Sequence, residues 1–145
     1  MATAESLTGG GVARAITSHA GSSAYFMGGI VAYGNDAKAS LLGVSQRILD
    51  ERGAVSAECA AAMAEGARQA FRTDLAVATT GIAGPAGATE RKPVGLVFIA
   101  VASDSGATVE EHRFDGDREA VTLASIEAAL GLLANRLEDP HDPAD

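Results

Sequence analysis

The apolar positions of this chain follow two patterns, a helical spacing and short uninterrupted runs. Helical spacing predicts three long helices, over residues 9–19, from Ser56 to about residue 71, and from Asp117 to about residue 137. The uninterrupted runs predict strands, the longest of which covers residues 94–102. Shorter runs predict four more strands, over residues 1–4, 26–33, 75–79 and 107–114. Strands separated by helices indicate an α/β domain.

Turn and capping residues divide the rest of the chain. Asn35 and Ser45 are of the residue types that cap helix N-termini, so short helices are expected over residues 35–42 and 45–52. Residues 103–106 form a turn signal between two strand-like runs, which predicts a hairpin. These elements together predict a three-layer α/β/α sandwich in which helices cover both faces of a mixed sheet.

Length and composition restrict the class of protein. The 145 residues fit one domain, placed at residues 1–138, and two prolines and three aspartates in residues 139–145 predict a disordered acidic tail. The net charge of −8 and only 11 scattered Lys and Arg residues argue against binding to nucleic acid. The single Cys59 excludes an internal disulfide. No apolar run approaches the roughly 18–20 residues of a membrane span, so we expect a cytoplasmic protein that does not bind membranes.

A serine, a tyrosine and a lysine at short spacing suggest serine chemistry without a catalytic histidine. Lys38 would lie in the first turn of a helix, where desolvation and the helix dipole lower the pKa of its side chain. A neutral amine can act as a base, and Ser23 is a candidate nucleophile fifteen positions earlier, with Tyr33 between them. The alternative is a surface lysine paired with Asp36 and an ordinary Gly-Ser-Ser turn.

Two glycine-rich loops follow predicted strands and are candidates for binding an anion. Ser6, Thr8 and Gly9 precede a helix, whose first amide groups are free to bind an anion. Thr80 and Gly81 begin the second loop at the end of a strand, where α/β folds place ligands and where amides could form an oxyanion hole. Tight packing of the loops explains both segments equally well.

Arg118 begins the last predicted helix, where a cation opposes the helix dipole unless it faces an anion. A phosphate or a carboxylate would suit its planar guanidinium, and a salt bridge to Asp115 or Asp117 is the alternative. The sequence has no Cys/His cluster and no HExxH spacing, so we expect neither a metal ion nor another cofactor.

Seven segments, taken in order, resemble the C-terminal domain family of the competence/damage-inducible protein CinA. They are AESLTGG at 4–10, GSSAYF at 21–26, VAYGNDAK at 31–38, GAVS at 53–56, TGIAGP at 80–85, KPVG at 92–95 and GDR at 116–118. The resemblance covers residues 2–137 and implies a CinA C-terminal-like fold. Family members usually carry a further helix before the first segment, so the resemblance implies that this N-terminal helix is missing here.

The resemblance also implies an activity, that of a nicotinamide-nucleotide amidase. Such a hydrolase converts nicotinamide mononucleotide to nicotinic acid mononucleotide and ammonia, a step of pyridine nucleotide salvage in NAD metabolism. Carried over by position, Ser23 would be the nucleophile and Lys38 its base, and Tyr33 would support the proton transfer. Ser6 is the second candidate for the nucleophile.

The remaining site residues are implied as substrate-binding, with Arg118 on the anionic part of the substrate. They are Ser6, Thr8, Gly9, Thr80, Gly81 and Arg118. A nucleotide is then the expected small-molecule partner, and the protein is expected to form a homo-oligomer. The alternative is a catalytically inert nucleotide-binding or interaction domain of the same fold.

Overall fold

Within residues 1–139, which the computed structural model describes, the sheet has five strands. They are β1 (Ala2–Glu5), β2 (Gly28–Val31), β3 (Ala76–Gly81), β4 (Leu96–Ser103) and β5 (Gly106–Arg113). Their order is β2-β1-β3-β4-β5, and β1 is parallel to both β2 and β3. β4 runs antiparallel to β3, and β5 runs antiparallel to β4. The mixed sheet and the hairpin expected from the sequence are confirmed.

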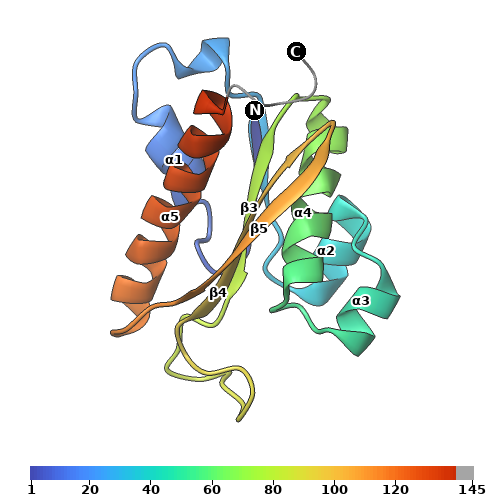
Figure 1. The fold of residues 1–145 in the computed structure, drawn as a ribbon, viewed down its shortest axis with the longest axis vertical. Helices are drawn as coiled ribbons and strands as arrows, with labels where there is room; N and C mark the ends of the chain where they lie inside the picture. Colours follow the sequence, from blue (N-terminus) through green and yellow to red (C-terminus); the bar gives the residue numbers. More distant parts are fainter. Residues whose placement is uncertain (140–145) are drawn as a thin grey trace.

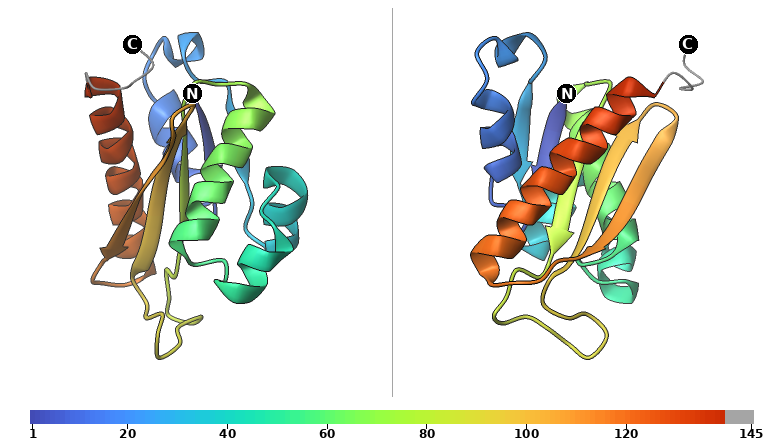
Figure 2. Two further views of the ribbon diagram at one scale, coloured as in Figure 1. Left: turned by 45° about the vertical axis from the view of Figure 1, so that its right-hand side comes forward. Right: turned by 60° about the vertical axis from the view of Figure 1, so that its left-hand side comes forward.

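Helices cover both faces of the sheet, as Figures 1 and 2 show. On one face lie α1 (Gly11–Thr17) and α5 (Arg118–Glu138). On the other lie α2 (Asn35–Leu42), α3 (Gln46–Glu51) and α4 (Ala57–Phe71). This is the three-layer sandwich that the spacing of apolar residues predicts.

Small side chains let α4 pack closely on the sheet. Ala60, Met63 and Ala64 lie on one face of the helix and are fully buried. The helix begins after Ser56, whose hydroxyl accepts the amide hydrogen of Cys59 at 3.1 Å. Branched residues of α1 and α5 fill the core on the other face, namely Val12, Ile16, Val121, Leu132 and Leu133.

The helices α2 and α4 come close to each other at Gly66. A Cβ atom at this position would overlap the main-chain carbonyl group of Leu42. We expect Gly66→Ala to lower the free energy of unfolding by about 2–3 kcal/mol, because overpacking forces the backbone to shift.

Gly131 in α5 is the matched control for this prediction, since a Cβ atom there meets open space. Gly131→Ala should raise the free energy of unfolding by about 0.5–1 kcal/mol. Urea unfolding measures both, and equal effects would contradict the close packing.

The position of β1 between β2 and β3 opens a crevice at one edge of the sheet. The helices that connect β1 to β2 and β2 to β3 lie on opposite faces. In α/β sheets a ligand site forms where the connections diverge in this way, outside the carboxyl ends of the strands. The residues that follow β1, β2 and β3 therefore lie where a ligand site is expected.

The helix α5 is long and apolar enough, by length and composition alone, to cross a membrane. A search for continuous apolar runs does not find this helix, because polar residues divide its apolar residues into short stretches. The helix packs on the sheet through Val121, Ser125 and Ala129, which is the usual position of a covering helix in such a fold. The predicted tail, apart from Asp139, lies outside the described residues.

Candidate active site

A small cavity lies at the carboxyl ends of the three parallel strands. Ser6 follows β1, Tyr33 follows β2, and Thr80 and Gly81 end β3, so the parallel pairing brings them to one edge. The cavity has a volume of about 240 Å³. Lys38, Asn35, Ala83, Gly84 and Arg118 also line it, together with neighbouring residues of the same loops.

Lys38 is buried against Ser6 at the bottom of this site. Its side chain is only 1% exposed, and its Nζ donates to Ser6 Oγ at 3.1 Å and to the Tyr33 carbonyl oxygen at 2.9 Å. Burial lowers the pKa of Lys38, because desolvation penalises the ammonium form, and the nearby Cys59 has a smaller, opposing effect. The lowered pKa that the sequence suggests is therefore supported, with burial as its main cause. The amine can exist in its neutral form beside a serine hydroxyl.

The N-terminus of α2 differs from the prediction in one detail. Gly34, not Asn35, is the N-cap residue, and it provides no side-chain cap. Lys38 still lies in the first turn, where its amide donates to the Gly34 carbonyl at 3.1 Å. The side chain of Lys38 is thus held by the start of a helix and by the carbonyl of Tyr33 just before it.

Ser23 lies at the opposite edge of the sheet, so the predicted Ser23–Lys38 pair is wrong. It is an exposed residue of η1 (Ser22–Ala24), a short 3-10 helix that precedes β2. Figure 1 shows this segment beside the N-terminus, and the Met1 amino group donates to the Tyr25 carbonyl. Each residue of β1 adds about 3.3 Å, so the length of the strand separates η1 from Ser6. The Gly-Ser-Ser segment is a tight turn that starts at Gly21, with φ of 86°.

Tyr33 contributes to the site through two different groups. Its carbonyl oxygen accepts a hydrogen bond from Lys38, whereas its hydroxyl accepts one from Arg118 Nη2 at 2.9 Å. The side chain is 61% exposed. The hydroxyl is therefore engaged with Arg118 at the mouth of the cavity, while the main chain orients the lysine.

Arg118 connects two walls of the cavity. It begins α5, and its Nη1 donates to the Gly84 carbonyl at 2.9 Å, opposite the bond to Tyr33. Asp117 caps the helix by accepting the amide hydrogen of Ala120 at 2.9 Å, so its carboxylate has a role other than a salt bridge to Arg118. The guanidinium is placed where an anion at the cavity mouth would meet it.

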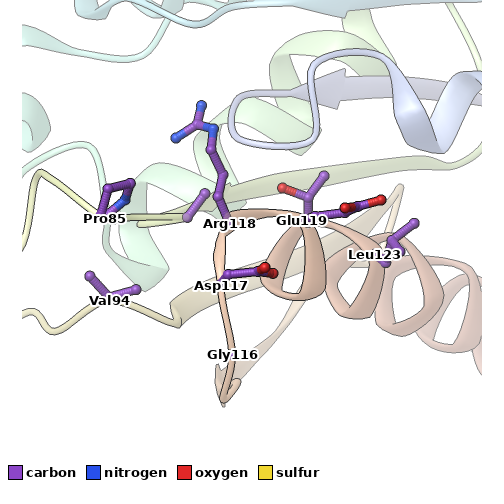
Figure 3. Close-up of a pocket in the computed structure, with 9 residues that line it drawn as sticks. Pro85, Val94, Gly116, Asp117, Arg118, Glu119 and Leu123 are labelled. Carbon is purple, nitrogen blue, oxygen red and sulfur yellow. The ribbon is translucent and has the colours of Figure 1, made fainter.

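A larger cavity of about 850 Å³ lies on the other side of Arg118. Its walls are mostly apolar and include Pro85, Val94 and Leu123 (Figure 3). In Figure 3 the Arg118 side chain extends away from α5, while Asp117 and Leu123 stay beside the helix. We call the 240 Å³ space the inner cavity and this one the outer cavity; Arg118 and Ala83 line both.

Hydrogen bonds and close packing against neighbouring segments hold the end of β3 and the loop that follows it. The Thr80 hydroxyl donates to the Ala54 carbonyl at 2.7 Å, and the Ile82 amide donates to the Leu96 carbonyl at 2.9 Å. At Gly81 a Cβ atom would lie 2.7 Å from the Val97 side chain. The packing explanation therefore accounts for Thr80 and Gly81, although both also line the inner cavity.

The anion site expected at the start of α1 is occupied by a side chain of the protein itself. Glu5 is 1% exposed, and its carboxylate accepts the amide hydrogens of Val12 at 2.7 Å and Ala13 at 3.1 Å. Thr8 is buried and donates its hydroxyl to the same carboxylate at 2.7 Å, and Gly9 lies exposed on the turn. Neither Thr8 nor Gly9 is among the described residues that line the inner cavity. Glu5 was missed because its contacts are made by the returning chain, although a charged residue directly after an apolar strand is a signal.

Metal-binding residue types do not gather anywhere in residues 1–139: no group of three or more His, Cys, Asp or Glu side chains could hold an ion. The polar side chains that line the inner cavity are the hydroxyls of Ser6, Tyr33 and Thr80, the amide of Asn35, the amine of Lys38 and the guanidinium of Arg118.

The fold and this site define an α/β domain that carries a buried serine–lysine pair at the carboxyl ends of its parallel strands. The chain belongs to the CinA C-terminal domain family, whose model matches residues 1–137. A CinA-like protein of Geobacter sulfurreducens is 52% identical over 137 residues, covering 94% of this chain and 33% of that protein. A putative competence-damage inducible protein of Moorella thermoacetica is 50% identical over 133 residues, covering 92% of this chain and 32% of that protein.

Solved structures support the same assignment. The competence/damage inducible protein CihA from Agrobacterium tumefaciens has a TM-score of 0.90 and 46% identity, covering 92% of this chain and 82% of that chain. The competence damage-inducible protein A (ComA) from Klebsiella pneumoniae has a TM-score of 0.92 and 32% identity, covering 97% and 87%. The chain spans about a third of the length of the curated relatives that it matches.

Proposed function

We propose that this domain is an amidohydrolase that converts nicotinamide mononucleotide to nicotinic acid mononucleotide and ammonia. The observation that carries the proposal is the buried pair of Ser6 Oγ and Lys38 Nζ, 3.1 Å apart. Serine–lysine pairs cleave acyl bonds where no histidine serves as the base. The substrate itself comes from the resemblance to the CinA family.

The first step forms an ester between Ser6 and the substrate. Neutral Lys38 takes the proton of Ser6 Oγ, and the oxygen attacks the carboxamide carbon. The tetrahedral intermediate carries a negative charge on the former carbonyl oxygen, for which the amides of Ala83 and Gly84 are our candidate donors. Lys38 then returns the proton to the leaving nitrogen, which departs as ammonia.

The second step hydrolyses the ester. Lys38, again neutral, takes a proton from a water molecule, and the resulting hydroxide attacks the acyl carbon. Collapse of the second intermediate breaks the bond to Ser6 Oγ, and the proton on Lys38 returns to that oxygen. The products are a carboxylic acid and the free enzyme, so no metal ion or redox partner enters the balance.

The sizes of the two cavities suggest how a nucleotide is bound. Binding sites for small molecules usually measure about 300–1,000 Å³, so the inner cavity, at about 240 Å³, suits the amide-bearing ring alone. The rest of the ligand would pass Arg118 toward the outer cavity. The guanidinium of Arg118 then meets the phosphate at the boundary, as a planar pair of donors.

Ammonia release from nicotinamide mononucleotide, measured with a chelator present, tests this function. We expect turnover with the mononucleotide and much weaker turnover with nicotinamide riboside, which has the same amide but no phosphate. A folded protein that releases no ammonia from the mononucleotide would contradict the proposal. Turnover of both compounds with equal kcat/KM would contradict the role given to the phosphate.

The role of Arg118 predicts a defect in binding more than in chemistry. Arg118→Gln should raise KM for the mononucleotide about 10- to 100-fold, since a hydrogen bond to a charged group contributes about 1.5–3 kcal/mol. Turnover of nicotinamide riboside should change little. Arg113→Gln is the matched control, because Arg113 is an exposed arginine paired with Glu111. A large fall in kcat with unchanged KM would show that Arg118 acts on the reaction and not on the phosphate.

A further inference from the structure

The buried carboxylate of Glu5 holds the turn that carries Ser6 in place. Glu5 accepts the amide hydrogens of Val12 and Ala13, which are the second and third residues of α1. These are the groups that a Ser or Asp N-cap side chain usually satisfies. The N-cap residue of α1 is Gly10, which has no side chain for this purpose. Glu5 therefore caps the helix from the preceding strand and closes the turn.

Two threonines extend this network to the central strand. Thr8 donates its hydroxyl to Glu5 Oε1 at 2.7 Å, and the Thr79 hydroxyl lies 2.7 Å from Thr8 Oγ1. Since the one hydroxyl hydrogen of Thr8 points to Glu5, Thr79 is the donor to Thr8. The Thr79 carbonyl also accepts the amide hydrogen of Ser6 at 3.0 Å. All three side chains are buried.

Ser6 is held on both sides by this arrangement. Its amide is bonded to Thr79, its carbonyl accepts the amide hydrogen of Gly9 at 3.0 Å, and its neighbour Glu5 is anchored to α1. Lys38 comes from α2, in the layer on the other face of the sheet. A reactive pair built from two layers needs its geometry held to within about 0.5 Å.

We propose that Glu5 and Thr8 are positioning residues that place Ser6 Oγ for its reaction with Lys38. This rests on the proposed function, in which Ser6 is the nucleophile. Neither residue lines the inner cavity, so both act through the turn and not on the substrate. Their loss should therefore change kcat and leave the binding of substrate almost intact.

The kinetic test uses Glu5→Gln, Thr8→Val and Thr8→Ser. Glu5→Gln puts an amide NH2 group among donors, and Thr8→Val removes the hydroxyl at nearly constant size. Both should lower kcat about 10- to 100-fold, as displacements near 1 Å do, with KM within about threefold. Thr8→Ser keeps the hydroxyl and should retain most of kcat. If Glu5→Gln does not fold, the pair Thr8→Val and Thr8→Ser still decides the question.

Ser45→Ala is the matched control for loss of a helix cap. The Ser45 hydroxyl accepts the amide hydrogen of Ile48 at 3.2 Å at the start of α3. Ser45→Ala removes a helix cap of the same kind, at α3, but should leave kcat unchanged. If Glu5→Gln and Thr8→Val lose stability as Ser45→Ala does yet keep kcat, the positioning role is overturned. Equal losses in Thr8→Ser and Thr8→Val would overturn it as well.

Amide NMR of Glu5→Gln separates this proposal from the amidase itself. We expect faster hydrogen exchange at Val12 and Ala13 together with shifted signals at Ser6 and Leu7. If only Val12 and Ala13 respond, Glu5 caps the helix without positioning Ser6, and the proposal fails whatever the substrate is. If the wild type releases no ammonia, the proposed function fails, and the signals of Ser6 still give the answer on positioning.

Discussion

Replacing Ser6 with alanine is expected to abolish ammonia release from nicotinamide mononucleotide. The hydroxyl is the only one bonded to Lys38 among the hydrogen bonds of the described residues. The other hydroxyls that line the inner cavity, those of Thr80 and Tyr33, are bonded to Ala54 and Arg118. Loss of a nucleophilic serine typically costs about 10³-fold or more in kcat. The variant should fold as the wild type does, because the one hydrogen bond of this hydroxyl within residues 1–139 is that from Lys38. A coupled assay of ammonia measures the loss.

Ser23→Ala is the matched control for Ser6→Ala, since each variant removes one serine hydroxyl next to a strand. Ser6 follows β1, and Ser23 precedes β2. Ser23 is exposed and lies at the other edge of the sheet, so kcat and KM should equal those of the wild type. Residual activity of Ser6→Ala near that of Ser23→Ala would show that another group attacks the amide.

Replacing Lys38 with methionine is expected to abolish activity and to stabilise the protein at neutral pH. The change removes the base but keeps an unbranched apolar side chain of similar length in a site that is 1% exposed. Removal of a buried amine that serves function commonly raises the free energy of unfolding, here by about 1 kcal/mol. The rate should fall about 10³-fold or more, since Lys38 is the only base that is hydrogen-bonded to the Ser6 hydroxyl among residues 1–139. Thermal unfolding and the ammonia assay together measure both effects.

The lowered pKa of Lys38 gives a pH dependence of known sign. Between its folded pKa and the ordinary value of 10.5, the unfolded chain holds a proton that the folded protein has lost. Stability contributed by this group therefore rises with pH across that window and is absent below the folded pKa. In Lys38→Met this slope should disappear. In the wild type, kcat/KM should rise with pH through the folded pKa, because only the neutral amine accepts a proton.

Lys92→Met is the control for the stability effect. Lys92 also donates its Nζ to a carbonyl, that of Arg52 at 2.6 Å, but the bond lies at an exposed position. The variant should gain no stability and should keep the pH slope of the wild type. If Lys38→Met is less stable than the wild type at neutral pH, the ammonium of Lys38 is not costly to bury, and its role as a neutral base loses its support.

The local signals in the sequence predicted the elements well. The spacing of Ala60, Met63 and Ala64 gave α4, and the cap at Ser56 gave its start, because both depend on residues a few positions apart. The apolar run of β4 and the turn at 103–106 gave the hairpin for the same reason. The spacing of apolar residues indicates which side of each element faces the core. Most of the elements of this fold can be predicted from that spacing.

To predict the site, one must know at which edge of the sheet each loop lies. Ser6 and Tyr33 each follow a strand, whereas Ser23 precedes one, and parallel pairing of β1 and β2 separates the two groups. The sequence shows which residues precede a strand and which follow one. Their positions in space also depend on how the strands pair, which local patterns do not show. Glu5 was missed for a related reason, since its partners at Val12 and Ala13 return to it only after a turn.

In the proposed reaction, Ser6 carries the acyl group of the substrate as an ester. Acid quench of the reaction with nicotinamide mononucleotide, followed by tryptic peptide mass spectrometry, tests it most directly. Cleavage after Arg14 and Lys38 places Ser6 in residues 1–14 and Ser23 in residues 15–38. We predict the mass of the bound acyl group on the first peptide, at Ser6, in the wild type. In Lys38→Met, which loses the cleavage site at residue 38 and gives residues 15–47 as its second peptide, we predict this mass on neither peptide. The same mass on the second peptide would contradict the account.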